Sequence, residues 1–261
     1  MKPTVFITTS EKGGARKSRS GGMIYHTLVE AGLDPIVLAL DTNNNLIGLL
    51  RDVPYLTWDI NNADESRRNL QTALQLALAD GRPLLMDVPG RGGHTLGIAT
   101  VLRTGMLKYA AHVVGIVPTL PDEESAHRAI GALATISPDE WIHIKYKSGE
   151  LDYSGDAHKK LALMKPAAVV TPPELTDEEA NAVSSLPVAL SRLEHYVRDT
   201  GMKAIGCLPY LAYWAEVRPQ LLAAIESVAP GLLATAIVHS VAETIADNNT
   251  VKAKARINPA A

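Results

Sequence analysis

The chain has 261 residues, a formal net charge of −3 and one cysteine, Cys207, and these features exclude several classes of protein. A single thiol excludes an internal disulfide and any metal site built from several thiolates of one chain. A mildly acidic chain has no bulk attraction for nucleic acid, so DNA binding would need a local basic patch. No stretch is apolar for long enough to cross a bilayer, and no signal-peptide pattern precedes the first Gly-rich loop. We therefore expect a cytoplasmic protein with a substantial core.

The first half of the sequence alternates between strand-like and helix-like segments. Short apolar runs predict strands, and apolar residues at helical spacing predict helices. The predicted strands are 5–7, 36–40, 84–86 and 112–117. The predicted helices are one through 24–31, then 66–80, 94–109 and one opened by Pro121. This alternation predicts an α/β fold, a doubly wound, mostly parallel sheet with helices on both faces and ligands at the carboxyl ends of its strands.

The second half is less regular. Strands are predicted at 142–147, 167–170 and 204–208. Thr176 and Glu179 form a capping-box pattern that should open a long helix towards Arg198, with a break at Pro187. Further helices are predicted near 213–228 and 232–247. Residues 51–65 form the longest irregular stretch, and a loop of that length is often functional.

The segment Thr8-Thr9-Ser10-Glu11-Lys12-Gly13-Gly14-Ala15-Arg16-Lys17-Ser18 carries the functional argument. It follows a predicted strand and opens a predicted helix, which is the context of a phosphate-binding loop. Glycines let backbone N–H groups turn towards phosphate oxygens, and the helix amino end adds a favourable dipole. Lys17 can reach the β- and γ-phosphates, and the Ser18 hydroxyl can hold Mg²⁺. The standard loop has glycine before this lysine, and here Arg16 stands in that place.

The pattern Lys-Gly-Gly-x-x-Lys-Ser at residues 12–18 resembles the deviant Walker A loop of the ParA/MinD family, P-loop ATPases of the SIMIBI kind. The resemblance implies that Lys12 reaches across an ATP-sandwiched dimer to the partner's phosphates. Arg16 and Arg19 bracket Lys17 and could add charge to the nucleotide or to a partner, or could be simply exposed to solvent. The residues assigned to ATP binding in this loop are Lys12, Gly13, Gly14, Ala15, Arg16, Lys17, Ser18 and Arg19.

Two further segments resemble the nucleotide-sensing loops of that family. Asp87 ends an apolar strand and precedes Pro-Gly, like the Walker B strand and second switch, where a carboxylate can polarise Mg²⁺-bound water. Asp41 matches the first aspartate of the first switch, or is simply a strand-end cap. The second aspartate is Asn43 here, and because an amide cannot accept a proton, hydrolysis is expected to be slow or to rely on Asp41. The resemblance thus implies Lys12, Asp41 and Asp87 as catalytic residues and Ser18, Asp41 and Asp87 as Mg²⁺ ligands.

Later segments give weaker signals. Leu208 and Pro209 resemble a late loop that packs on adenine, although a strand followed by a Pro turn explains them equally well. Two basic stretches are candidate DNA surfaces or plain solvated faces. Their members are Lys145, Lys147, Lys159, Lys160 and Lys165 in the first, and Lys252, Lys254 and Arg256 in the second.

The resemblance favours a ParA-like ATPase that acts in plasmid partition or stability. It implies ATP and Mg²⁺ as cofactors, an ATP-dependent homodimer, non-specific DNA and a centromere-binding or other adaptor protein as partners. We expect one domain over 1–261, with a flexible tail at 250–261.

Three alternatives stay open. A membrane-positioning switch of the MinD kind would need an amphipathic C-terminal helix with bulky apolar residues, and 250–261 has no aromatic residue. A small-molecule ATP-dependent enzyme usually lacks the leading lysine at position 12. A hydrolysis-poor ATP-binding module remains possible because of Asn43.

Overall fold

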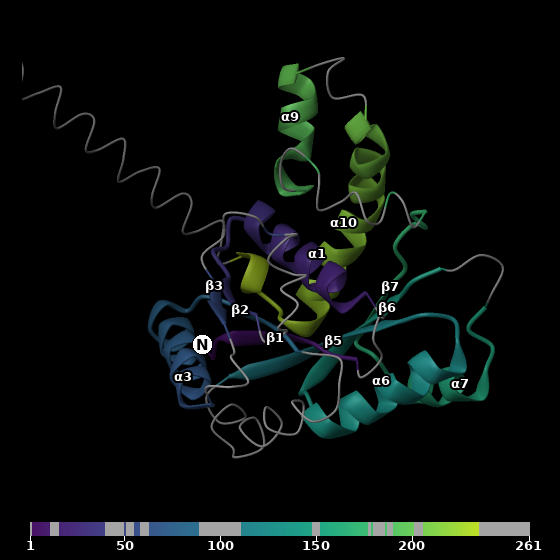
Figure 1. The fold of residues 1–261 in the computed structure, drawn as a ribbon, viewed down its shortest axis with the longest axis horizontal. Helices are drawn as coiled ribbons and strands as arrows, with labels where there is room; N and C mark the ends of the chain where they lie inside the picture. Colours follow the sequence, from purple (N-terminus) through teal and green to yellow (C-terminus); the bar gives the residue numbers. More distant parts are fainter. Residues whose placement is uncertain are drawn as a thin grey trace, which may run out of the picture.

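Seven parallel strands make one sheet within the part of the chain that the computed structural model describes (Figure 1). The described residues are 2–10, 16–39, 50, 55–57, 63–88, 111–147, 152–176, 179, 186, 190–200 and 206–234. The strands are β1 (Thr4–Thr8), β2 (Ile36–Ala39), β3 (Tyr55–Thr57), β4 (Leu84–Asp87), β5 (His112–Thr119), β6 (Glu140–Lys145) and β7 (Ala168–Val170). Their order is β3-β2-β4-β1-β5-β6-β7, and every neighbouring pair is parallel.

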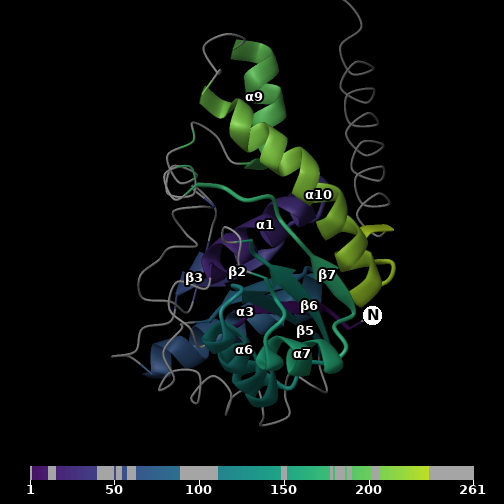
Figure 2. The same cartoon turned by 90° about the vertical axis from the view of Figure 1, so that its right-hand side faces the viewer.

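Helices cover both faces of this sheet (Figures 1 and 2). The helices are α1 (Lys17–Glu30), α3 (Ala63–Asp80), α6 (Glu123–Ile136), α7 (Asp156–Leu163), α9 (Leu193–Thr200) and α10 (Leu208–Val228), with a 3₁₀ turn at Leu190–Arg192. α1, α9 and α10 lie on one side, and α3, α6 and α7 lie on the other. This arrangement confirms the predicted doubly wound α/β fold.

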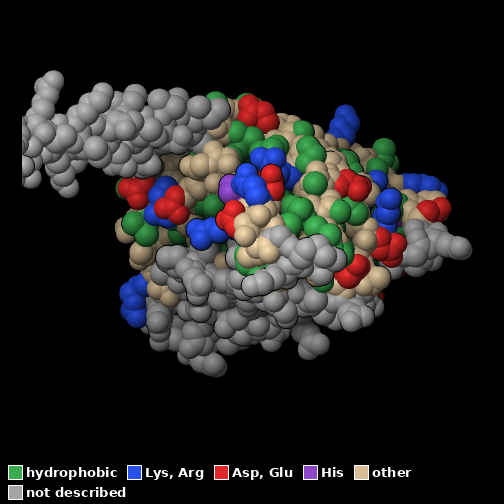
Figure 3. All heavy atoms as spheres, turned by 90° about the horizontal axis from the view of Figure 1, so that it is seen from above, with side chains coloured by type: hydrophobic (Ala, Val, Ile, Leu, Met, Phe, Trp, Pro, Cys, Tyr) green, Lys and Arg blue, Asp and Glu red, His purple; other side chains and the backbone are tan. Residues whose placement is uncertain are grey.

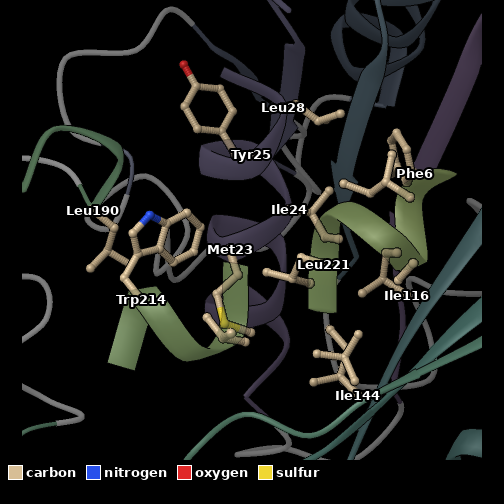
Figure 4. Packing of buried hydrophobic residues seen from close by; sticks show 14 of the residues in the cluster. Phe6, Met23, Ile24, Tyr25, Leu28, Ile116, Ile144, Leu190, Trp214 and Leu221 are labelled. Carbon is tan, nitrogen blue, oxygen red and sulfur yellow. The ribbon is translucent and has the colours of Figure 1, made fainter. Parts of the chain in front are cut away.

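The continuous apolar runs of the strands follow from this double cover, because a strand buried on both faces has no polar side. All five residues of β1 are buried, and they pack alternately against the two layers of helices. Phe6 packs with Ile24 of α1 and Leu221 of α10 (Figure 4), whereas Val5 and Ile7 pack in the cluster that includes α3. A third cluster, around Trp141, joins β5 and β6 to α6 and α7.

The strand order gives the sheet a switch point at β1. The chain runs from β1 towards β2 on one side and later continues from β5 towards β7 on the other, so the order reverses at β1. In this register Thr8 lies opposite Asp87 of β4 and Ile116 of β5. Ligands bind at such switch points in open α/β sheets, beyond the carboxyl ends of the strands.

The strand predicted at 204–208 is wrong where the structure describes it. Gly206 and Cys207 form a 3₁₀ turn and Leu208 begins α10, with Pro209 in the first helical turn. Proline cannot donate to a strand ladder, but its fixed φ suits the start of a helix. The helix predicted from position 213 therefore begins earlier.

The interval 51–65 is not wholly irregular, because it contains β3 and the first residues of α3. The short helix α7 was not predicted. The capping box is present, since the Thr176 hydroxyl accepts from the Glu179 N–H at 3.2 Å and the Thr176 N–H donates to the Glu179 carboxylate at 2.9 Å. Leu186 lies in a bend, but 180–185 and 187–189 lie outside the described residues, so the long helix and its break at Pro187 stay predictions.

Several predicted segments fall outside the described residues: the helix at 94–109, most of the helix at 232–247 and the tail at 250–261. None of the described helices combines the length and the apolar character that a membrane crossing requires.

Candidate functional site

The predicted strand–loop–helix unit is present at the switch point. β1 ends at Thr8 and α1 begins at Lys17. The loop is anchored on one side by the Thr9 N–H, which donates to the carbonyl of Ile116 on β5 at 2.9 Å. Of the predicted site residues, Lys12, Gly13, Gly14, Ala15, Asp41 and Asn43 lie outside the described residues.

Asp87 lies at the centre of the site and is 1% exposed. Its Oδ1 accepts a hydrogen bond from the Thr8 hydroxyl at 2.5 Å, and its Oδ2 accepts one from the Ser18 hydroxyl at 2.8 Å. The Val88 N–H also donates to the Thr8 carbonyl, at 3.3 Å. One carboxylate thus joins the ends of β1 and β4 to the first turn of α1.

This arrangement suits a magnesium site. Burying a carboxylate is costly unless its oxygens are hydrogen-bonded, and the two hydroxyls meet that need. Hydroxyl and carboxylate oxygens are also the hard ligands that Mg²⁺ prefers, commonly alongside phosphate oxygens. Ser18 and Asp87 therefore fit the ion that the sequence assigned to them. Thr8 was not assigned a role, although its place at the end of β1, in register with the end of β4, could have indicated one.

Lys17 is the first residue of α1 and is only 7% exposed. The amino end of a helix is its positive pole, so a cation held there is best matched to an anion. Backbone N–H groups of the first turn are also free of intrahelical partners by construction. The position of Lys17 therefore suits an anionic ligand such as a phosphate group.

Arg16 and Arg19 are both half-buried rather than fully exposed. Arg16 is the N-terminal cap residue of α1 and has a left-handed backbone, with φ 59° and ψ 28°. Its guanidinium carbon lies 5.0 Å from the ring centroid of Tyr146, a cation–π contact. Tyr146 follows β6 and was not predicted to belong to the site, because no local pattern links it to the loop.

A set of buried and half-buried polar rings extends from Tyr146 along the carboxyl ends of β5 and β6. The Tyr153 hydroxyl shares its proton between the carbonyls of Thr119 and Tyr146, at 2.8 and 2.7 Å. His143 Nε2 lies 2.8 Å from the Thr119 hydroxyl. Burial, followed by the positive charge of Lys145, lowers the pKa of His143 to about 3. Burial raises the pKa of Tyr146 and of Tyr153, so all three rings are neutral at pH 7.

Leu208, Pro209 and the first basic stretch are the remaining predicted site residues that the structure describes in part. Leu208 and Pro209 stand in the first turn of α10, so the predicted strand and late loop is not their setting, and Leu208 is 47% exposed. Lys145 lies over the Tyr153 ring at 5.2 Å, and Lys159 pairs with Asp156 at 3.2 Å.

The basic stretch is therefore partly engaged in local contacts. The residues Lys252, Lys254 and Arg256 lie outside the described residues. Figure 3 shows Lys/Arg and Asp/Glu side chains interspersed on the described part of one face rather than gathered by sign.

A scan against protein-family models finds no match for the chain, and a search of curated proteins finds none either. Solved structures with the same fold do match. The MinC:MinD cell division protein complex from Aquifex aeolicus matches with 13% identity and a TM-score of 0.53, over 84% of this chain and 96% of that one. MinD from Pyrococcus horikoshii, complexed with Mg-ADP, matches with 14% identity and a TM-score of 0.52, over 88% and 97%.

A third similar structure, a protein from Borrelia burgdorferi assigned to plasmid partition and bound to AMPPNP, has 12% identity and a TM-score of 0.50, over 86% and 98%. The chain spans only 52% of FtsY from Mycoplasma mycoides at a TM-score of 0.42, and that likeness carries no argument. Identities this low show the fold alone. The chain therefore shares the open, parallel α/β fold of these structures, as the sequence predicted.

Proposed function

We propose that this protein is an ATPase of the ParA/MinD type, a switch that dimerises on binding ATP and Mg²⁺ and acts in plasmid partition or stability. The observation that carries the proposal is the hydrogen bond from the Ser18 hydroxyl to the Asp87 carboxylate at 2.8 Å, at the switch point of the sheet. Support for the nucleotide comes from two structures of this fold, one named with Mg-ADP and one with AMPPNP.

Each residue of the loop has a role in this proposal. The backbone of residues 13–16 and the side chain of Lys17 bind the phosphates, and Lys12 reaches the phosphates of the partner subunit. Ser18, Asp87 and Asp41 hold Mg²⁺, which neutralises phosphate charge when it is bound. Thr8 fixes the orientation of Asp87 through its hydrogen bond to Oδ1.

The proposal also covers turnover and partners. Asp41 and Asp87 position the attacking water, and Asn43 makes turnover slow because its amide accepts no proton. The γ-phosphate biases the loops after Asp41 and Asp87 between two states, and hydrolysis returns the dimer to monomers. Non-specific DNA and an adaptor protein are the proposed partners. The naming of a MinC:MinD complex among structures of this fold supports an adaptor of protein nature.

Light scattering with ATP-Mg²⁺, with ADP-Mg²⁺ and without nucleotide tests the proposal, alongside measurement of phosphate release. The mass of the wild type should double with ATP-Mg²⁺ but not with ADP-Mg²⁺ or without nucleotide. Lys12→Ala and Lys17→Ala should abolish the change. Lys159→Ala is the matched control, because this exposed lysine on α7 pairs only locally with Asp156. It should dimerise like the wild type.

The outcomes separate the alternatives. If nucleotide binds and the mass never changes, the partition-type switch is wrong and an ATP-binding module or a small-molecule enzyme replaces it. If dimerisation occurs without phosphate release, the chain is a switch that does not hydrolyse ATP. DNA binding is tested by its salt dependence, since contacts to phosphates weaken steeply as salt rises.

A further inference from the structure

The backbone of Arg16 is unusual for its position. Three non-glycine residues among those described have positive φ: Arg16, Ser137 and Lys165. Ser137 caps the end of α6, and Lys165 follows the end of α7, where left-handed residues are common. Arg16 instead precedes a helix, where an extended backbone is the rule. Glycine adopts the left-handed conformation freely, whereas a residue with a Cβ needs its surroundings to hold it there.

Tyr146 supplies those surroundings. Its ring lies under the Arg16 guanidinium at 5.0 Å. The Ser20 hydroxyl donates to the Arg16 carbonyl at 3.1 Å and also lies 3.0 Å from the Tyr146 hydroxyl. With its proton directed to the Arg16 carbonyl, the Ser20 oxygen can accept from the Tyr146 hydroxyl. Tyr146 therefore holds Arg16 twice, by its ring and through Ser20.

Tyr146 is itself fixed by the sheet. It is 1% exposed. Its N–H donates to the carbonyl of Thr119, the last residue of β5, at 3.0 Å, and its carbonyl accepts from the Tyr153 hydroxyl at 2.7 Å. The ring under Arg16 is therefore a rigid part of the core, joined to α1 by a contact between residues 126 positions apart in sequence.

We propose that Tyr146 is a positioning residue that holds Arg16 in its left-handed conformation and so sets the first turn of α1. Lys17 and Ser18 follow directly, and their directions depend on the backbone of Arg16. In the standard loop, glycine adopts the left-handed conformation without help. Here the side chain of Tyr146 holds Arg16 in that conformation. The consequence is that Lys17 and Ser18 are held in place before the nucleotide arrives, which favours binding. The role of this clamp towards ATP rests on the proposed function.

A double-mutant cycle on ATP affinity, measured by calorimetry, tests the clamp. Tyr146→Leu should weaken ATP binding about tenfold in the wild-type background, and less than about twofold in the Arg16→Gly background. The reason is that glycine at position 16 needs no clamp. Equal losses in the two backgrounds would show that Tyr146 acts only through general stability, and would overturn the proposal.

A second pair of variants leaves the core untouched. Arg16→Ala and Arg16→Gly remove the same charge and the same stacking contact, but only alanine keeps the Cβ that strains a left-handed backbone. Arg16→Ala should therefore bind ATP about fivefold to tenfold more weakly than Arg16→Gly. Equal affinity of these two variants would contradict the clamp.

Tyr146→Phe and Tyr25→Leu serve as controls. Tyr146→Phe keeps the ring under the guanidinium and should retain most of the affinity. Tyr25→Leu removes another buried tyrosine from the same core cluster and from α1 itself, and should have the same effect in both backgrounds.

If the wild type binds no ATP, the proposed function fails, and the same cycle is read on the free energy of unfolding without nucleotide. Non-additive effects of the substitutions at positions 16 and 146 on the free energy of unfolding would support the clamp, and additive effects would contradict it. Failure of the clamp and failure of the ATPase proposal are thus distinguishable.

Discussion

Asp87 and His158 are both buried polar residues, but their surroundings differ. Asp87 is 1% exposed and both its oxygens accept hydrogen bonds from hydroxyl groups of β1 and α1. His158 on α7 is 4% exposed, and neither of its ring nitrogens has a hydrogen-bond partner in the described part of the structure. Its ring packs edge-on against Tyr153, with centroids 4.6 Å apart.

The difference indicates two uses of a buried polar group. A charged carboxylate is tolerated in a core only when its oxygens are satisfied, and hydroxyl partners can rotate towards a metal ion or a phosphate when one binds. An imidazole with no hydrogen-bond partner contributes mainly shape and contact area. The first environment suits a binding site and the second suits packing.

The largest expected effect is at the carboxylate. Asp87→Asn keeps the volume of the side chain but removes its charge and one acceptor, so Mg²⁺-dependent phosphate release should fall about 100-fold or more. Steady-state phosphate release measures this. Asp139→Asn is the matched control, because the Asp139 carboxylate accepts from the Val113 N–H at 2.8 Å, at the opposite end of β5. Full activity of Asp87→Asn would place Asp87 in the same structural class as His158.

Around His158, stability should be most sensitive to substitutions at the contact between α6 and α7. The Glu123 carboxylate accepts from the Ala157 N–H at 3.0 Å and caps α7, and a Cβ built at Gly155 would lie 1.5 Å from Glu123 Oε1. Because Glu123 Oε1 is the end of a flexible side chain, Gly155→Ala should displace it and cost about 1 kcal/mol, the value of the lost capping hydrogen bond. Urea denaturation measures this.

Gly206→Ala is the control for that substitution, because a Cβ there meets nothing within 4 Å. Adding Glu123→Ala to Gly155→Ala should cost little more, since the capping hydrogen bond is already lost in the single variant. A Gly155→Ala protein with unchanged stability would contradict the close approach of the two helices.

Stability should also depend on pH through His143. Burial lowers the pKa of this residue to about 3 in the folded state, from an ordinary value of 6.5. Its neutral form is therefore favoured by folding. The resulting stability is fully present above pH 6.5 and is lost as the pH falls towards 3, at up to about 1.4 kcal/mol per pH unit. The difference in free energy of unfolding between wild type and His143→Gln, measured from pH 7 to pH 4, should shrink along this window. A constant difference would show that His143 does not titrate in this way.

The smallest effect is expected at His158. Replacing it by phenylalanine removes two unsatisfied nitrogens and keeps a flat ring against Tyr153, so stability should change by less than about 0.5 kcal/mol or rise slightly. His143→Phe is the contrasting variant and should cost about 1 kcal/mol, because it leaves the Thr119 hydroxyl without its partner at 2.8 Å. Urea denaturation of both variants checks the pair. A large loss in His158→Phe would indicate a hydrogen bond to His158 outside the described residues.

Much of the fold could be predicted because its signals are local. β1, β4 and β5 are continuous apolar runs, and α6 begins at a Pro-Asp-Glu-Glu sequence whose Asp122 side chain accepts from the Ser125 N–H at 2.8 Å. The described end of the segment 204–208, which precedes Pro209, was predicted wrongly because an apolar run of that length fits a strand and a helix start equally well. α7 was not predicted because its eight residues give too few turns for a clear apolar period.

The sequence by itself determined the strand and the helix on either side of the Gly-rich loop, since apolar runs and helical periodicity are local signals. The resemblance assigned Ser18 and Asp87 to one Mg²⁺ site, but their hydrogen bond across 69 positions was decided by the tertiary structure. Only the tertiary structure decided that Thr8 completes the cradle of Asp87 and that Tyr146 lies under Arg16. Parallel register brings the ends of β1 and β4 together, and the packing of β6 beside β5 brings position 146 to the start of α1. Such contacts depend on which strands become neighbours, and no local pattern records that.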